Sequence, residues 1–368
     1  MTRVLLLCGL PWMGLRVIYC LRAAGYEVDV IANRWFVFKS SRYVRKFSIL
    51  KFPNAENPDP EFTAFVRRYI EENGIHCVIG DHVETQILID QMGSNLGPVA
   101  RFPSMATKDL RLFDDKWAFN RVLRENDLPG PPSHLIQQAG DVSGPEVAFL
   151  GFPVIIKPLT EAGGHGVVKA DTLADLENHV SGDRPHSELP LIVQKYLPGF
   201  DAGISFLAAD GRILGRSLQR YHPFDGSIEF FRSGEIEEFG VRFARLTGYT
   251  GVANIDLRVD GVFRLLGVIE CNPRFWNSIV PSRIHGLNFV KAGVDLALGA
   301  DPETLNVGDY REGTYYPARA AVKRWIANRG TLDGIDRENI RELGYQTLDI
   351  MPYVYRTFIK LQGRRLTR

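Results

Sequence analysis

The strand–helix–strand rhythm of the first third of the chain constrains its fold more than any other feature. VLLLCG (4–9) has the pattern of a strand, GLRVIYCLRAAG (14–25) that of a helix and YEVDVIA (26–32) that of a second strand. Three such elements in close succession are typical of a parallel βαβ unit. We therefore expect a Rossmann-like N-terminal domain. The turn after the first strand lacks GxGxxG, which disfavours a dinucleotide site.

The pattern changes after a predicted helix over 110–132, which a Pro/Gly-rich turn closes. From there the chain reads as strands with short hairpin-like links, as in an α+β domain, so a boundary near residue 100 is expected. From about residue 310 the chain is helix-prone and increasingly basic. A packed helix with a solvated basic face is one interpretation of that end, and an anion or membrane contact is the other.

Composition places the chain among globular proteins with sizeable cores. It has 368 residues, 45% of them hydrophobic, and 44 Lys+Arg against 43 Asp+Glu give a net charge of +1. That balance does not favour a nucleic-acid partner, so any anion site must be local. The four cysteines show no metal-ligand spacing, and no apolar stretch reaches the ~18 residues of a membrane span. We expect a cytoplasmic protein without an integral membrane segment.

A phosphate site is indicated where FPVIIKP (152–158) leads into TEAGGHGV (160–167). Glycines let backbone N–H groups close on phosphate oxygens, and the Lys157 ammonium supplies positive charge. An ordinary three-glycine hairpin is the alternative, and the stretch is not a Walker A loop.

In LIVQKYLPGFD (191–201) a strand ends in a turn whose backbone could read an adenine edge, with Asp201 accepting from ribose hydroxyls. A plain surface turn is the alternative there.

A metal site is indicated by IECNPRFWNS (269–278). Glu270 and Asn272 are two apart on a predicted strand, so they face the same way, and carboxylate and amide oxygens are ligands that Mg²⁺ takes. Arg274 can fork onto a phosphate. The alternative is a buried Glu–Arg pair. Cys271 falls on the opposite strand face, and we expect it in the core.

Candidates for holding substrates lie on two sides. Asp81, His82 and Glu84 follow the predicted strand in IHCVIGDHVET (75–85), beyond the carboxyl end where open α/β sheets bind ligands. Asp81 and Glu84 could together hold an ammonium. A solvated loop with a helix cap is the alternative. On the other side stand the candidates that follow the metal motif, which are Arg274, Ser278, Arg283 and His285. Routine surface pairing would account for them equally well.

The motifs occur in a recognisable order: Asp115-Lys116, FPVIIKP, GGHGV, VQKYLPG, GVANIDLRVD and IECNPRFW. This ordered set resembles the ATP-grasp superfamily, in particular its carboxylate–amine ligase and carbamoyl-phosphate-synthase-like branches, over roughly residues 1–300. The resemblance implies a Rossmann-like domain followed by an ATP-grasp fold, in which two α+β subdomains clasp ATP. It divides the chain into 1–100, a linker helix and lid at 101–195, a C-terminal subdomain with the metal site at 196–305, and a helical basic extension at 306–368.

The resemblance also implies a role for each matching residue. Lys116 and Lys157 would hold the ATP phosphates under the loop, and Gln194 to Leu197 would contact adenine. Arg274 and Lys157 would be catalytic, and Asp256 would join Glu270 and Asn272 in holding Mg²⁺, with Mn²⁺ as an alternative ion. The full nucleotide-binding set is Lys116, Lys157, Gly163, Gly164, His165, Gly166, Gln194, Lys195, Leu197 and Asp201.

Two departures from the family pattern bear on these roles. Many relatives have glutamate where Gln194 stands, which affects the purine preference. A strict two-residue turn at Asp260-Gly261 would pair Asp256 with Leu265, too far from Glu270 to share a metal. Either that turn is longer or bulged, or Asp256 is not a ligand.

The expected function is that of a ligase that uses ATP and Mg²⁺ to convert a small-molecule carboxylate to an acyl phosphate and joins it to an amine. One alternative is an enzyme that activates bicarbonate or carbamate, and another is a non-catalytic nucleotide-binding subunit. The quaternary state stays open, with a homodimer as one alternative.

Overall fold

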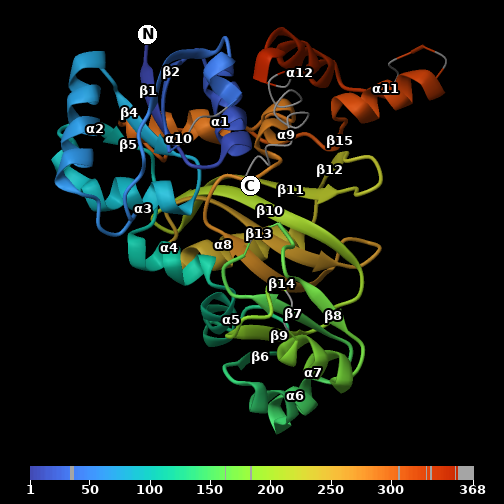
Figure 1. The fold of residues 1–368 in the computed structure, drawn as a ribbon. Helices are drawn as coiled ribbons and strands as arrows, with labels where there is room; N and C mark the ends of the chain where they lie inside the picture. The colour runs from blue at the N-terminus through green and yellow to red at the C-terminus, as the bar shows by residue number, and fades with distance from the viewer. Residues whose placement is uncertain are drawn as a thin grey trace.

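The computed structural model describes residues 1–33, 37–161, 163–182, 185–305, 307–328, 330–331, 334–352 and 354. Of the helix-prone, basic region that begins near residue 310, residues 355–368 lie outside the described residues, so the choice between a solvated basic face and an anion or membrane contact stays open there. Figure 1 shows three bodies along the chain: a parallel sheet flanked by helices, a central antiparallel sheet, and a smaller lobe at the bottom of the view.

The first hundred residues form the expected Rossmann-like unit. Its parallel sheet has the order β3-β2-β1-β4-β5. The α2 helix (Pro60–Asn73) is capped at its end by Gly74, which adopts a left-handed conformation with φ of 58°. The strands are β1 (Arg3–Cys8), β2 (Glu27–Ala32), β3 (Val44–Ile49), β4 (Cys77–Gly80) and β5 (Ala100–Arg101), and the helices are α1 (Pro11–Ala23), α2 (Pro60–Asn73) and α3 (Val83–Met92).

Two helices, rather than the single helix predicted over 110–132, link this unit to the rest of the chain. They are α4 (Thr107–Asp114) and α5 (Lys116–Glu125). Asp115 separates them because its backbone is extended and its carboxylate accepts a hydrogen bond from the N–H of Ala118 at 2.7 Å, which caps α5. The break places Lys116 at the first position of α5.

A four-stranded antiparallel sheet of order β6-β9-β7-β8 forms the small lobe, which we call the lid. It consists of β6 (Ser133–Ile136), β7 (Val154–Pro158), β8 (Val168–Ala170) and β9 (Leu191–Lys195), with α6 (Pro145–Leu150) and α7 (Leu173–Ser181) packed on it. Residues such as Val147, Ile156 and Leu176 form a core of the lid that is separate from the main core. The lid therefore has its own packing and can be regarded as a subdomain.

A six-stranded antiparallel sheet of order β14-β13-β10-β11-β12-β15 forms the centre of the molecule. Helix α8 (Gly234–Thr247) packs on β10 and β11. The last strand of the sheet comes from a region predicted to be helical, since residues 313–315 pair with β12 instead. The strands are β10 (Phe200–Ala209), β11 (Arg212–Tyr221), β12 (Ile228–Phe231), β13 (Gly251–Val259), β14 (Leu265–Asn272) and β15 (Gly313–Tyr315).

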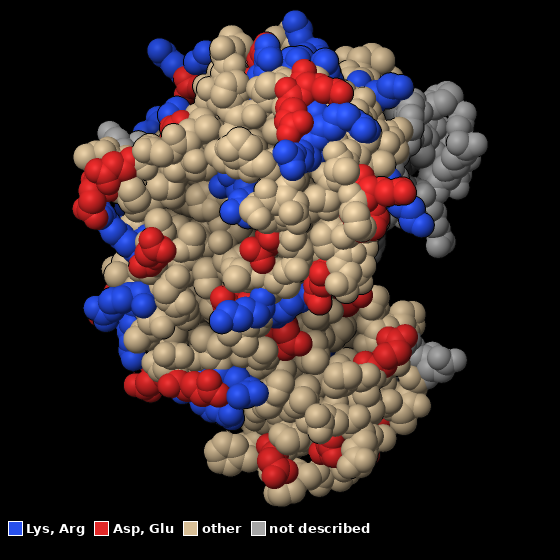
Figure 2. All heavy atoms as spheres, turned by 90° about the vertical axis from the view of Figure 1, so that its left-hand side faces the viewer, with Lys and Arg blue, Asp and Glu red and all other residues tan. Residues whose placement is uncertain are grey.

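The remaining helices are α9 (Ile279–Ile284), α10 (Phe289–Ala297), α11 (Ala318–Ala327) and α12 (Arg337–Leu348). Of these, α10 contacts β10 of the central sheet as well as the Rossmann-like unit. Helix α9 packs on α1 and α12, and α10 packs on α1 and β5, so the two bodies share one continuous core. Figure 2 shows charges of both signs interspersed over the face that it draws. None of the described helices is both long and apolar enough to cross a membrane.

Candidate active site

A cleft of about 1200 Å³ separates the lid from the central sheet. The lid lobe is set off from the body by an indentation at the right-hand edge of Figure 2. Strands of both sheets contribute side chains to the cleft, although their residues are far apart in the sequence. The sequence-predicted residues that line it are Lys157, Gly163, Gly164, Gln194, Lys195, Leu197, Asp201, Asp256, Glu270, Asn272, Arg274 and Ser278.

Two carboxylates face each other on the floor of this cleft. Asp256 of β13 is paired directly with Glu270 of β14, because two register shifts and a turn spanning 260–264 replace the strict two-residue hairpin. That hairpin is therefore wrong, and the bulged alternative holds. Burial, and then the charge of Glu270, raise the pKa of Asp256 well above its usual value.

Such a pair of acids suits a divalent cation. Bringing two carboxylates together in a buried site is unfavourable without a positive charge between them, and Mg²⁺ is commonly bound by one or two carboxylates together with phosphate oxygens and water. Among the described residues no cluster of three or more His, Cys, Asp or Glu could hold a metal. Asp256 and Glu270 therefore fit Mg²⁺ only if amide, phosphate or water oxygens complete the coordination.

Amide groups hold the carboxylate of Asp256 in place. Asn254 donates to its Oδ1 at 2.7 Å, and Asn272 donates to its Oδ2 at 3.2 Å. The Oδ1 of Asn272 in turn accepts from the guanidinium of Arg274 at 2.7 Å. Arg274 also donates to the carbonyl of Phe275 at 3.0 Å. The arginine that follows the proline thus reaches back to the end of β14, beside the predicted metal ligands.

Two buried lysines stand beside the carboxylates. Lys116 Nζ lies 3.3 Å from Glu270 Oε2 and donates to the carbonyl of Glu161 at 2.5 Å. Lys157 lies on β7 and lines the cleft. Burial opposes ionisation of Glu270, but Lys116, a hydrogen bond from Asp256 and Lys157 together lower its pKa below its usual value. The site therefore keeps an ionised glutamate between two ammonium groups.

The charge of Lys157 gives a pH-dependent prediction. Burial lowers its pKa to about 8, so the ammonium is present below pH 8 and lost above it. Bound ATP would favour the charged form, and binding near pH 8 should take up a proton. We expect the affinity for a non-hydrolysable ATP analogue to fall by up to about tenfold per pH unit above pH 8. Calorimetry in buffers of different ionisation enthalpy measures both effects, and Lys157→Met should remove them. Equal affinity at pH 7 and pH 9 would contradict this role.

The glycine-rich loop has the backbone geometry that the phosphate role requires. Gly163, Gly164 and Gly166 have φ of 71°, 76° and 70°, in the left-handed region that favours glycine. A Cβ at Gly166 would lie 2.6 Å from the Cβ of His186. Gly163 and Gly164 line the cleft, whereas His165 and Gly166 of the same loop are not among its lining residues.

Arg258, which no sequence motif indicated, holds the turn after β9. Arg258 donates from Nε to the carbonyl of Leu197 at 3.1 Å and from Nη1 to Asp201 at 2.6 Å. Gln194, whose side chain is buried, donates to Ser133 at 3.0 Å. Arg258 follows Asp256 by two residues on one strand, so the same two-residue period that places Glu270 and Asn272 on one face could have identified it.

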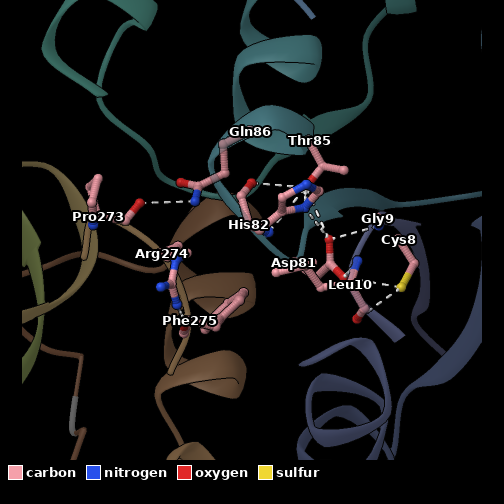
Figure 3. Close-up of polar contacts among 10 residues, drawn as sticks. All are labelled: Cys8, Gly9, Leu10, Asp81, His82, Thr85, Gln86, Pro273, Arg274 and Phe275. Carbon is pink, nitrogen blue, oxygen red and sulfur yellow. Dashed lines mark hydrogen bonds and ion pairs between the residues drawn. The ribbon is translucent and has the colours of Figure 1, made fainter. Parts of the chain in front are cut away.

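Asp81 and Glu84 do not form the predicted ammonium site. Asp81 is fully buried and accepts from the N–H groups of Gly9 at 3.0 Å and Leu10 at 2.8 Å (Figure 3). His82 contacts the same carboxylate at 2.7 Å. Burial opposes ionisation of Asp81, but His82 and the hydrogen bond from the Gly9 N–H lower its pKa below the usual value. Its oxygens are therefore already used within the fold.

Glu84 lies in the first turn of α3 and pairs with Arg111. The Nη1 and Nη2 atoms of Arg111 donate to the two carboxylate oxygens of Glu84 at 2.5 and 3.0 Å. Neither Asp81 nor Glu84 lines the cleft. The helix-cap alternative thus fits the structure, with His82 as the N-cap of α3 and half-buried rather than fully solvated. The reason is that α3 begins within three residues of β4, which leaves no open loop.

The candidates after the metal motif separate in space. Ser278 lines the cleft. Arg283 instead forms a buried ion pair with Glu342 of α12, and His285 stacks on Phe230 with ring centroids 4.2 Å apart. Cys271 is buried, as expected for the core. The short helix α9 directs Arg283 and His285 away from the cleft.

The cleft also includes residues that no sequence motif indicated, such as Trp12 of α1 and Gln346 of α12.

Comparison with known proteins agrees with this architecture. Residues 187–316 match the family model described as ATP-grasp in the biosynthetic pathway with Ter operon. The chain is 25% identical over 227 residues to the carbamoyl phosphate synthase large chain of Thermoanaerobacter pseudethanolicus, an alignment that covers 56% of this chain and 20% of that relative. This chain thus corresponds to about a fifth of the relative's length.

Solved structures give the same result for the fold. An L-amino acid ligase from Bacillus licheniformis superposes with a TM-score of 0.62 at 18% identity, covering 85% of this chain and 78% of that one. The biotin carboxylase domain of a Hydrogenobacter thermophilus 2-oxoglutarate carboxylase gives 0.62 at 16% identity, covering 85% and 73%. N5-carboxyaminoimidazole synthetase from Staphylococcus aureus gives 0.60 at 12% identity, covering 84% and 79%. With its Rossmann-like unit, its lid and its paired carboxylates in this arrangement, the chain has the fold of ATP-grasp proteins, and residues 187–316 match an ATP-grasp family model.

Proposed function

We propose that the protein is a ligase that uses ATP and Mg²⁺ to activate a carboxylate as an acyl phosphate and then joins it to an amine, releasing ADP and phosphate. The observation that carries this proposal is the convergence of Lys157, Asp256, Glu270, Asn272 and Arg274 on one cleft. These residues are the cations and oxygen ligands that phosphoryl transfer from ATP needs. An L-amino acid ligase among the similar structures supports the reaction class.

The nucleotide would lie between the two sheets. We assign the adenine to the turn at 194–197, the ribose to Asp201 and the phosphates to Lys157, Lys116 and the loop at 163–166. Asp256, Glu270 and Asn272 would hold Mg²⁺, which would neutralise charge on the phosphate oxygens when bound. Lys116 is buried 3.3 Å from Glu270 and does not line the cleft, so it would act on the phosphates through its charge.

The chain's own cations account for the chemical step. The Lys157 ammonium and the Arg274 guanidinium would stabilise the charge on the transferring phosphoryl group, which a carboxylate oxygen of the acid attacks in line with the departing ADP. The amine then attacks the acyl carbonyl and phosphate leaves. Closing the lid would keep water from hydrolysing the intermediate. Asp81 and Glu84 are not available to accept the amine's proton.

Hydroxylamine tests the intermediate. A screen of ADP release across pairs of amino acids first identifies an acid, and hydroxylamine then replaces the amine. Because hydroxylamine attacks acyl phosphates, we expect a hydroxamate together with ADP and phosphate in equal amounts. The Glu270→Gln variant serves as the control for contaminating activity. Formation of AMP and pyrophosphate, or of a phosphorylated product that hydroxylamine does not intercept, would show that the proposal is wrong.

Bicarbonate is a second candidate for the carboxylate. One similar structure is described as holding MgADP and the bicarbonate anion, and another is an N5-carboxyaminoimidazole synthetase. ADP release that depends on bicarbonate without any organic acid would favour this candidate. The same assay therefore separates the two.

A further inference from the structure

The edge of the parallel sheet where an α/β protein usually binds its ligand is filled in this molecule. At the carboxyl ends of β1 and β4, Asp81 accepts from Gly9, Leu10 and the thiol of Cys8 (Figure 3). His82 leaves no space above Gly9, where a Cβ would lie 2.0 Å from the imidazole Cε1. These contacts leave no room for a ligand at this edge of the sheet.

The same contacts fix the start of α3. The hydroxyl of Thr85 donates to Asp81 at 3.2 Å and lies 3.1 Å from the backbone nitrogen of His82, which donates to it. Gly80 has no room for a side chain, because a Cβ there would lie 2.9 Å from the backbone nitrogen of Gln86. Gln86 follows Thr85, so its side chain extends from a first helical turn that is held rigidly.

Gln86 connects this turn to the catalytic loop of the other body. Its side chain is 7% exposed, and its Nε2 donates to the carbonyl of Pro273 at 3.0 Å, while its Oε1 accepts from the hydroxyl of Ser104 at 2.9 Å. A carbonyl can only accept, so chemistry alone requires the NH₂ end of the amide to face Pro273. Figure 3 shows this contact reaching from α3 to the segment that carries Arg274.

The Pro273 carbonyl belongs to the peptide whose N–H is that of Arg274. That N–H donates to the carbonyl of Asn272 at 2.8 Å, which makes a tight turn. Phe275 packs edge-on against Phe102, with ring centroids 5.3 Å apart. The peptide before Arg274 and the ring after it are thus both seated on the Rossmann-like unit, and the guanidinium between them points to the metal ligands.

We propose that Gln86 is a positioning residue for Arg274, acting through the Pro273 carbonyl. The role in catalysis rests on the proposed function, but the structural coupling does not. Removing the donor leaves a buried carbonyl unpaired, which is relieved most readily by rotation of the Pro273–Arg274 peptide. The guanidinium would then move away from the phosphoryl group, where small displacements are costly.

The test compares Gln86→Glu and Gln86→Met with a matched control. Gln86→Glu keeps the shape and the acceptor for Ser104 but sets a carboxylate oxygen against the Pro273 carbonyl. Gln86→Met removes both hydrogen bonds without adding a charge. The control is Gln91→Glu, an identical change on the same helix, where Gln91 donates to Thr107 at 2.8 Å on the surface. Thermal melting checks that all three fold.

The first measurement needs no substrate. The Nε–H NMR signal of Arg274, assigned by its absence in Arg274→Lys, should shift or broaden in both Gln86 variants and stay in place in Gln91→Glu. An unchanged signal in folded Gln86→Met would overturn the positioning role, whatever the enzyme catalyses.

The second measurement is a double-mutant cycle. In Gln86→Met we expect kcat to fall about tenfold or more, with KM for ATP changed by less than about twofold. In an Arg274→Ala background the same change should have no further effect, because the group it positions is gone. An equal loss of kcat in both backgrounds would show that Gln86 acts independently of Arg274. If the wild-type protein turns over no ATP, the proposed function fails, and the NMR signal still decides the positioning role.

Discussion

Glu270→Gln is expected to reduce ATP turnover by at least about 100-fold, since changes in the residues around a metal site already cost about 10- to 100-fold. The amide has the size of the carboxylate but lacks the charge that, in the proposed site, would face a cation shared with Asp256. Affinity for Mn²⁺ in the presence of ADP should fall in parallel, because only one charged ligand remains. ADP release and calorimetric Mn²⁺ binding measure the two effects.

The variant should remain folded, and this distinguishes a ligand from a structural ion pair. Lys116 lies 3.3 Å from Glu270. If the main role of Glu270 were to pair with this lysine, the substitution would leave a buried ammonium uncompensated and lower the free energy of unfolding markedly. Glu71→Gln is the matched control, because Glu71 forms an exposed ion pair with Arg67 at 2.9 Å. A Glu270→Gln protein that unfolds readily but keeps its activity per folded molecule would favour the structural pair.

Gly164→Val is expected to weaken ATP binding by about tenfold or more while changing the melting temperature little. A Cβ at Gly164 meets nothing within 4 Å, so the substitution has space, but its φ of 76° is strained for a branched residue. The loop should relax to another conformation and withdraw its N–H groups from the phosphates. Calorimetry with a non-hydrolysable ATP analogue measures the loss.

Gly140→Val provides the control for a branched residue in the lid. Gly140 also has open space around it, but its φ lies outside the left-handed region. We expect this variant to bind the analogue as the wild type does. Equal affinity of Gly164→Val and wild type would exclude the loop from the phosphate site.

The sequence alone identified the elements whose pattern is local. The βαβ rhythm and the strands β13 and β14 follow from hydrophobic period and turn residues, which act over a few neighbours. Glu270 and Asn272 were assigned to one face because alternation along a strand is strict. Cys271 was assigned to the core for the same reason.

Tertiary structure decided what depends on register and on contacts between distant segments. Two register shifts in the β13–β14 pair bring Asp256 opposite Glu270, and no local rule fixes where a bulge falls. Asp81 was mistaken for a substrate ligand because its partners at Gly9 and Leu10 are about seventy residues away in the chain. No sequence motif indicates the contact of Gln86 with Pro273. The side-chain amide finds this partner only when the Rossmann-like unit packs against the segment after β14.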